Sequence, residues 1–155
     1  MPNQAVTEFP IPAENNSPFS IALGPDGNVW FTEVGINGSG SGIGRITPGG
    51  TITEFTGPGS PGGITARPDG ALWFTEIAGD KIGRMTTAGV VTDEIPITAG
   101  SDEITTGPDG ALWFAEAGKD QIGRIDPTTQ NSHRVRYRYG RSSVSARYMG
   151  PAPPT

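Results

Sequence analysis

The sequence predicts an all-β protein with about three β-propeller blades, each a sheet of four antiparallel strands, which together form a partial propeller. The first observation is a repeated cassette: Trp-Phe-Thr-Glu begins at Trp30 and Trp73 and returns as Trp-Phe-Ala-Glu at Trp113. The second is the spacing, because intervals of 43 and 40 residues between the tryptophans match a four-stranded blade. The third is composition: 24 glycines and 15 prolines in 155 residues exclude a helical bundle.

The second repeat shows how each blade is built. Residues 64–66 and 71–76 are predicted as its first two strands, joined by an Arg-Pro-Asp-Gly turn in which proline presets φ and glycine releases the chain. The third and fourth strands are predicted at 81–85 and 90–95. The repeat predicts the following organisation: an N-terminal segment with the outer strand of an adjoining blade at 1–16, blades at 17–55, 56–95 and 96–139, and a disordered basic, proline-containing tail at 140–155.

The tryptophans are predicted to fill the space between blades. Side chains alternate along a strand, so Trp73 faces one side of its sheet whereas Phe74 and Glu76 face the other. A blade cannot cover its own faces, so each face needs a neighbouring blade. The alternative for Trp30, Trp73 and Trp113 is an aromatic ligand cage.

Composition and charge exclude several classes of protein. The chain has no cysteine, which excludes a disulfide scaffold and a thiolate metal site. No apolar run approaches the length of a membrane span, and no signal peptide is visible, so we expect no membrane partner and a cytoplasmic location. Residues 1–127 hold all sixteen acidic side chains and only six basic ones, and this acidic body would repel nucleic acid.

The segment from Thr128 onward breaks the repeat, since it holds five arginines and no acid. Alternating arginine and tyrosine between Val135 and Tyr139 is compatible with the fourth strand of the third blade. A basic aromatic segment that binds nucleic acid and a stretch that begins where a reading frame was cut are the alternatives.

Repeated carboxylates are the first candidates for a binding site. Glu33, Glu76 and Glu116 each follow the Trp-Phe pair of a second strand, so adjacent blades could point them toward one face to share a cation. The alternative is that each caps a turn or forms an ion pair of little stability with an arginine that recurs in step. Those arginines are Arg45, Arg84 and Arg124.

Asp102 and Glu103 are the second candidates, because they open the third repeat where the second repeat has Gly62 and Gly63. Two acids at a first strand could face the central channel and bind Mg²⁺, Ca²⁺ or a cationic group. The alternative is a solvated strand edge.

The cassettes resemble those of the streptogramin B lyases, also called virginiamycin B lyases. The resemblance covers residues 5–127 and is closest where an Ala-Leu-Trp-Phe strand is followed by Ile-Gly-Arg, at 71–84 and 111–124. It implies a propeller of seven blades, of which this chain holds about three. It also implies that a cyclic depsipeptide antibiotic is opened at its ester by elimination, which would confer antibiotic resistance. In that reaction a histidine transfers the proton and a magnesium ion bound near glutamates stabilises negative charge.

The sequence departs from the family pattern where that chemistry would occur. The family's working histidines follow a proline at the start of a first strand, and the matching positions here are Phe19, Gly62 and Asp102. The single histidine of the chain is His133. We therefore expect a lyase-like chain that is inactive by itself, and neither a catalytic residue nor a metal ligand is assigned.

Two alternatives remain. A non-catalytic binding or assembly module could close a ring by homo-oligomerisation, since three blades cannot close one and open blade edges favour pairing. An enzyme reassembled from several copies could instead build a site at the chain junction from Asp102, Glu103, Glu116 and His133.

Overall fold

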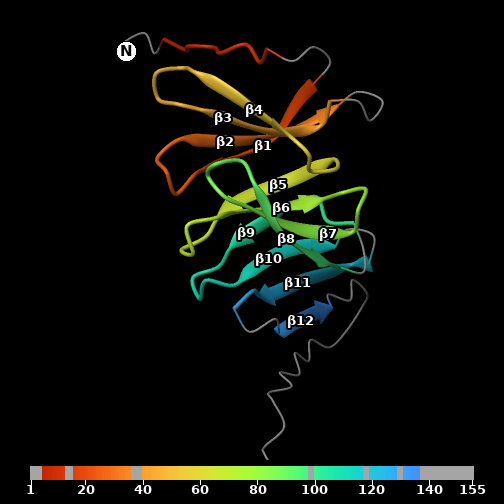
Figure 1. The fold of residues 1–155 in the computed structure, drawn as a ribbon. Helices are drawn as coiled ribbons and strands as arrows, with labels where there is room; N and C mark the ends of the chain where they lie inside the picture. Colours follow the sequence, from red (N-terminus) through yellow and green to blue (C-terminus); the bar gives the residue numbers. More distant parts are fainter. Residues whose placement is uncertain are drawn as a thin grey trace, which may run out of the picture.

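A computed structural model describes residues 5–12, 16–35, 40–97, 100–116, 119–128 and 131–136. These residues form three antiparallel sheets of four strands, stacked one against the next in chain order (Figure 1). We call the sheets blades 1, 2 and 3. The prediction of an all-β partial propeller is confirmed. No helix in the described part of the chain is long and apolar enough to cross a membrane.

The strands follow one another in each sheet without a crossover. Blade 1 consists of β1 (Asn16–Leu23), β2 (Val29–Gly35), β3 (Gly42–Ile46) and β4 (Ile52–Thr56). Blade 2 consists of β5 (Pro61–Ala66), β6 (Leu72–Glu76), β7 (Lys81–Met85) and β8 (Val91–Pro96). Blade 3 consists of β9 (Ile104–Thr106), β10 (Leu112–Glu116), β11 (Gln121–Asp126) and β12 (Asn131–Arg136).

The two ends of the repeat differ from its middle. Strand β12 pairs with β11, with His133 opposite Arg124. As far as Arg136, the segment therefore forms the fourth strand of the third blade. Residues 137–139 and the predicted tail at 140–155 lie outside the described residues. Residues 5–11 contain no strand, and the outer strand expected there would need the edge of an adjoining blade, so it stays a prediction.

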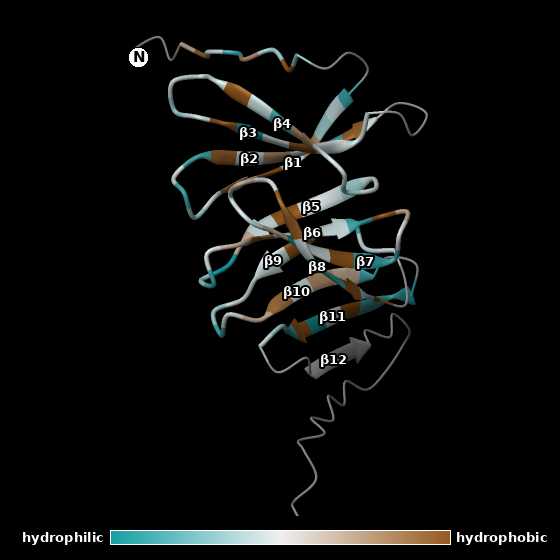
Figure 2. Ribbon diagram, in the orientation of Figure 1, coloured by the Kyte–Doolittle hydropathy of each residue, from teal (hydrophilic) through white to brown (hydrophobic). Residues whose placement is uncertain are grey.

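Trp30 joins blade 1 to blade 2. Its side chain is fully buried in one cluster with Ile64, Leu72, Phe74 and Met85, which all come from blade 2. Apolar stretches recur along the strands of all three stacked sheets (Figure 2). The prediction that the tryptophans fill the space between blades is confirmed for this residue.

Trp73 repeats this arrangement one blade further along. It is 2% exposed and lies in one cluster with Ile104, Leu112, Phe114 and Ile125 of blade 3. Burying an aromatic side chain of this size contributes about 2–3 kcal/mol, so each tryptophan is a major part of its interface.

Hydrogen bonds reinforce the same interfaces at the first strands. Thr32 Oγ1 donates to the carbonyl of Gly62 at 2.6 Å, which ties blade 1 to blade 2. The amide of Gly63 donates to the carbonyl of Asp102 at 2.6 Å, which ties blade 2 to blade 3. A Cβ atom at Gly63 would lie within 3.0 Å of backbone atoms of Glu103 and Ile104. These glycines therefore let neighbouring first strands approach closely.

The glycine of each Ile-Gly-Arg motif makes room for a phenyl ring. Gly83 lies opposite Phe74 in the register of β6 and β7, and a Cβ atom there would overlap the ring. Blades 1 and 3 repeat the pair, which gives Phe31 with Gly44 and Phe114 with Gly123. The motif is thus the steric complement of the Trp-Phe strand.

We expect Gly83→Ala to lower the free energy of unfolding by about 1–3 kcal/mol, because the added methyl group overlaps the buried ring of Phe74. Chemical denaturation monitored by tryptophan fluorescence measures this. Gly59→Ala is the matched control, since no atom lies within 4 Å of the position its Cβ would take. Equal unfolding midpoints for the two variants would contradict the steric argument.

Candidate functional site

The three predicted glutamates are buried near the ends of their second strands. Glu33, Glu76 and Glu116 are 2%, 4% and 0% exposed. Within the described part of the chain, Oε1 of Glu33, Oε1 of Glu76 and both carboxylate oxygens of Glu116 have no hydrogen-bond partner. Asn16 Nδ2 donates to Glu33 Oε2 at 2.7 Å. Because burying an unpaired polar atom costs free energy, these carboxyl groups lower the stability of the folded chain.

Arg84 and Arg124 pair with other acids, and Arg45 donates to the carbonyl of Thr87 at 3.4 Å, so the interpretation that these arginines neutralise the glutamates is wrong. Arg84 Nε lies 3.4 Å from Asp69 Oδ2, and Arg124 Nη2 lies 2.6 Å from Asp109 Oδ2. Both aspartates belong to the Pro-Asp-Gly turns. The hydrogen bond from Arg124 is the main cause that lowers the pKa of Asp109.

The alternation of side chains along a strand explains why the arginines pair with these aspartates and not with the glutamates. Arg84 lies opposite Trp73 in register, so it occupies the tryptophan face, whereas Glu76 is three residues after Trp73 and faces the other way. The Arg84 guanidinium carbon is 6.0 Å from the Trp73 ring centre, and that of Arg45 is 5.6 Å from the Trp30 ring centre. The arginines therefore cover the tryptophans.

A second glutamate lies near each of the buried glutamates of blades 1 and 2 and acts on its pKa. Burial raises the pKa of Glu76, and Glu94 raises it further through charge repulsion and a hydrogen bond between the two carboxyl groups. Lys81 Nζ lies 2.9 Å from Glu94 Oε2, and its hydrogen bond lowers the pKa of Glu94. The two carboxyl groups therefore have pKa values shifted in opposite directions, raised for Glu76 and lowered for Glu94. In blade 1, burial raises the pKa of Glu33, and Glu54 adds to this rise.

The carboxylates do not meet the requirement of a metal centre. Their oxygen atoms are the ligand type that Mg²⁺ prefers. However, no group of three or more acidic, histidine or cysteine side chains is placed to hold an ion among the described residues. Glu33, Glu76 and Glu116 lie on β2, β6 and β10, each in its own blade.

Asp102 and Glu103 are joined to their neighbours through the backbone. Both side chains are exposed, just before β9. The carbonyl of Glu103 accepts a hydrogen bond from the amide of Ala115 at 3.2 Å, and the carbonyl of Asp102 accepts the bond from Gly63 described above. This geometry matches the solvated strand edge, while a ligand of the two carboxylates stays a prediction. The backbone of His133 lies in β12, but its side chain is not among the described ones, so the junction site also stays a prediction.

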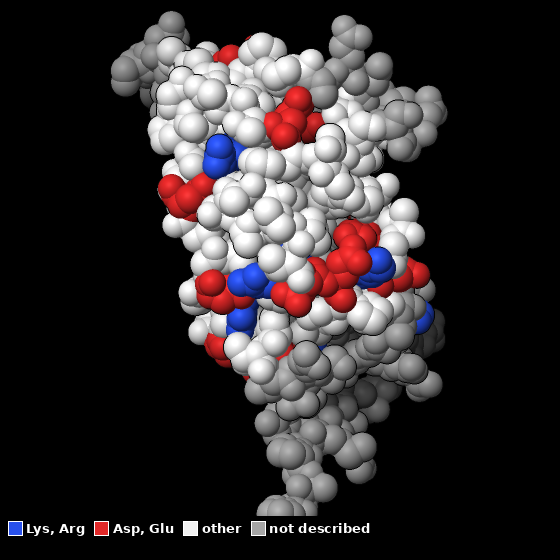
Figure 3. Space-filling model, in the orientation of Figure 1, with Lys and Arg blue, Asp and Glu red and all other residues white. Residues whose placement is uncertain are grey.

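A pocket that we did not predict from the sequence lies between blades 2 and 3, with a volume of about 470 Å³. Strand β8 forms one side of it, and the end of β11 with Pro127 and Thr128 forms the other. Acidic and basic side chains lie next to one another over this part of the surface (Figure 3).

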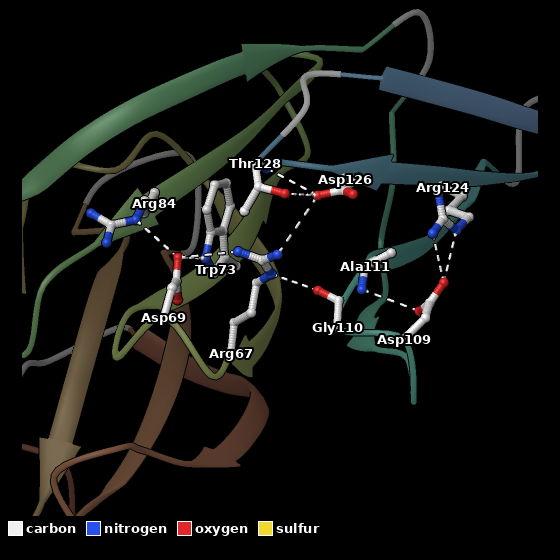
Figure 4. A network of polar contacts seen from close by, with 10 residues as sticks. All are labelled: Arg67, Asp69, Trp73, Arg84, Asp109, Gly110, Ala111, Arg124, Asp126 and Thr128. Carbon is white, nitrogen blue, oxygen red and sulfur yellow. Dashed lines mark hydrogen bonds and ion pairs between the residues drawn. The ribbon is translucent and has the colours of Figure 1, made fainter.

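Arg67 bridges the two blades beside this pocket (Figure 4). Its Nε donates to the carbonyl of Gly110 at 2.6 Å, and Nη1 and Nη2 lie 3.5 Å and 3.8 Å from carboxylate oxygens of Asp69 and Asp126. One feature of the sequence marks this contact: Arg67 stands where the other two turns have Gly24 and Gly107.

The fold and its repeated interfaces define a β-propeller protein whose blades interlock through a buried Trp-Phe strand. The model of the virginiamycin B lyase family matches residues 1–135, and the chain belongs to this family. Virginiamycin B lyases from Bordetella parapertussis and Bordetella bronchiseptica are 38% identical to it over 57 residues, which are 37% of this chain and 18% of each relative.

Solved structures agree with this assignment. Virginiamycin B lyase from Staphylococcus aureus superposes with a TM-score of 0.78 at 38% identity, over 90% of this chain and 48% of that enzyme. A catalytically inactive variant of the same enzyme with quinupristin gives 0.76 at 39% identity, over 88% and 46%. The chain therefore spans about half the length of the lyases whose structures it matches. Regucalcin from Agrobacterium tumefaciens, with a TM-score of 0.64 at 20% identity, shows the fold alone.

We expect Glu76→Gln to raise the melting temperature at pH 7, because the amide is neutral and can still donate to Glu94. The pKa of Glu76 is raised in the folded state, so wild-type stability falls as the pH rises from the ordinary value of 4.5 through the folded-state pKa. The advantage of the variant should therefore shrink as the pH falls toward 4. Thermal unfolding at both pH values measures this.

The exposed Glu103 offers a matched control, since Glu103→Gln should change the melting temperature little at either pH. A Glu76→Gln variant that is less stable than the wild type at pH 7 would show that the carboxylate form is the one the fold needs.

Proposed function

We propose that this chain supplies three blades of a propeller that opens a cyclic depsipeptide antibiotic of the streptogramin B type at its ester by elimination. The family match over residues 1–135 is the observation that supports this proposal. The likeness to the Staphylococcus aureus enzyme adds to it, since one of that enzyme's structures contains quinupristin. The partner proposed for this chain is accordingly a small cyclic peptide.

The base of such an elimination must lie within hydrogen-bond reach of the proton that it removes. Of the three positions where the family resemblance places a histidine, Phe19 is an exposed apolar side chain and Gly62 has no side chain. A Cβ atom at Gly62 would lie 2.7 Å from Thr75 Oγ1, so this position has no room for an imidazole. We propose that these blades hold the antibiotic and that the chain alone does not turn it over.

Magnesium is proposed as the cofactor of that reaction from the family resemblance alone. When bound, it would stabilise the negative charge that develops during the elimination. The described residues offer single buried carboxyls in place of a ligand set, so no step is assigned to the ion here.

A second candidate function, an assembly module that closes a ring from several copies, is favoured by the outer face of blade 1. Ile21 and Ile64 occupy the same register position, opposite Phe31 and Phe74. Ile64 is 4% exposed because the Trp30 face of blade 1 covers it, whereas Ile21 is 70% exposed. We propose that the tryptophan face of a second copy covers Ile21. The other exposed apolar side chains of β1 are Phe19 and Leu23.

One experiment tests both candidates: light scattering on a sizing column, followed by an assay of each fraction for opening of quinupristin with and without magnesium. We expect a mass of two or three chains, because an open apolar face favours pairing. Ile21→Asp should shift the mass toward one chain, and Thr53→Asp, a change on β4 away from that face, should not. A wild-type chain that stays monomeric would contradict ring closure by copies.

The assay decides the enzymatic proposal independently of the mass. We expect fractions to bind quinupristin, detected by calorimetry, and to leave it unopened. Magnesium-dependent opening would establish the lyase reaction and contradict the expected inactivity of the isolated chain. Fractions that neither bind nor open quinupristin would contradict the lyase proposal itself.

A further inference from the structure

The pocket between blades 2 and 3 exists because one position of the repeat changes size. Phe55 in β4 lies opposite Ile43, and Ile95 in β8 lies opposite Ile82, so Phe55 and Ile95 are equivalent. In blade 1 the phenyl ring stacks on Trp30, with ring centres 5.3 Å apart and an interplanar angle of 17°. In blade 2 the shorter aliphatic side chain stands in its place and lines the pocket.

The phenyl ring of Phe55 also reaches the next blade. A Cβ atom at Gly89, in the turn between β7 and β8, would overlap this ring, so the ring fills the space between blade 1 and that turn. The equivalent turn of blade 3 follows β11 and includes Pro127 and Thr128, which both line the pocket. Ile95 has no aromatic ring to fill the equivalent space. The pocket therefore occupies the place that an aromatic ring takes one blade earlier.

The arginine of the repeat shows which kind of group fits this place. The guanidinium carbon of Arg45 lies 5.6 Å from the Trp30 ring centre and 5.7 Å from that of Phe55, so it contacts two aromatic faces. The Arg84 guanidinium has one such contact, with Trp73 at 6.0 Å, and also lines the pocket. An aromatic ring bound there would give Arg84 the second contact that Arg45 already has.

The walls of the pocket are held by polar contacts. Arg67 is only 9% exposed in its side chain and links the turn of blade 2 to Gly110 and Asp126 of blade 3, so it fixes the distance between the blades. Asp93 is an exposed acid at the lining and lies opposite Arg84 in register, so its carboxylate can accept a hydrogen bond from a ligand. A volume of about 470 Å³ is within the range of small-molecule sites.

We propose that this pocket binds a small aromatic compound that carries a hydrogen-bond donor. Its ring takes the position that Phe55 takes between blades 1 and 2, next to the guanidinium of Arg84, and its donor reaches the carboxylate of Asp93. This site is independent of the lyase proposal, because it uses none of the strand-start positions Phe19, Gly62 and Asp102.

In the test, the full chain is titrated with benzyl alcohol and with its saturated analogue cyclohexylmethanol, which has no aromatic face. Binding is followed through the indole N–H signals of the three tryptophans in NMR spectra. We expect the Trp73 signal to move, and benzyl alcohol to bind about two- to fivefold more tightly than the saturated alcohol, the factor that a cation–π contact supplies.

Two variants assign the binding to this pocket. Ile95→Phe restores the residue of blade 1 and should abolish the shift at Trp73. Arg84→Gln should leave both alcohols bound while removing the preference for the aromatic one, and it keeps the test valid if Ile95→Phe does not fold.

A Trp73 shift that persists in folded Ile95→Phe would overturn the proposal. So would equal affinity of the wild type for the two alcohols. N-acetyltyrosine amide, used in place of benzyl alcohol, distinguishes the source of the ring: tighter binding of this compound would make a peptide side chain the ligand, and weaker binding supports a free small molecule.

Discussion

The packing of each tryptophan against the next blade is the interaction on which the rest of the structure depends. Trp30 and Trp73 stand on second strands, yet both are buried among residues of the following sheet. Each blade is therefore stable only as part of a stack. The glycines of the repeat follow from this constraint, because Gly83 admits the Phe74 ring behind the tryptophan and Gly63 admits the first strand of the next blade.

The same constraint decides where charge can go. Arg84 shares the tryptophan face and is paired with Asp69, whose pKa is lowered because hydrogen bonds outweigh the effect of its burial. Glu76 is left on the opposite face, buried beside Glu94, with its pKa raised. A carboxyl that recurs at this place in every blade resembles a repeated metal ligand in sequence. In the structure it is a buried carboxyl within each sheet.

Much of the fold could be predicted from the sequence because the repeat encodes it in local signals: the spacing of Trp30, Trp73 and Trp113, and turns marked by Pro-Asp-Gly. The pairing of arginine with aspartate was missed because the face on which Arg84 lies depends on the register between strands. A motif gives the spacing of residues along the chain but not this register. The pocket was missed for another reason. Ile95 is an ordinary strand residue, and its smaller volume matters only beside Phe55, which fills the equivalent place one blade earlier.

Native-state hydrogen exchange on a Trp73→Ala variant tests most directly whether the interfaces, and not the single blades, carry the stability. Removing the ring should cost about 3–5 kcal/mol. Because the ring is packed on Ile104 and Leu112, amides of β9, β10 and β11 should lose protection together with those of β6. Val90→Ala, at an exposed site of the same blade, should leave both sets unchanged. Loss of protection confined to β5–β8 would show that blade 2 is stable by itself and would contradict this account.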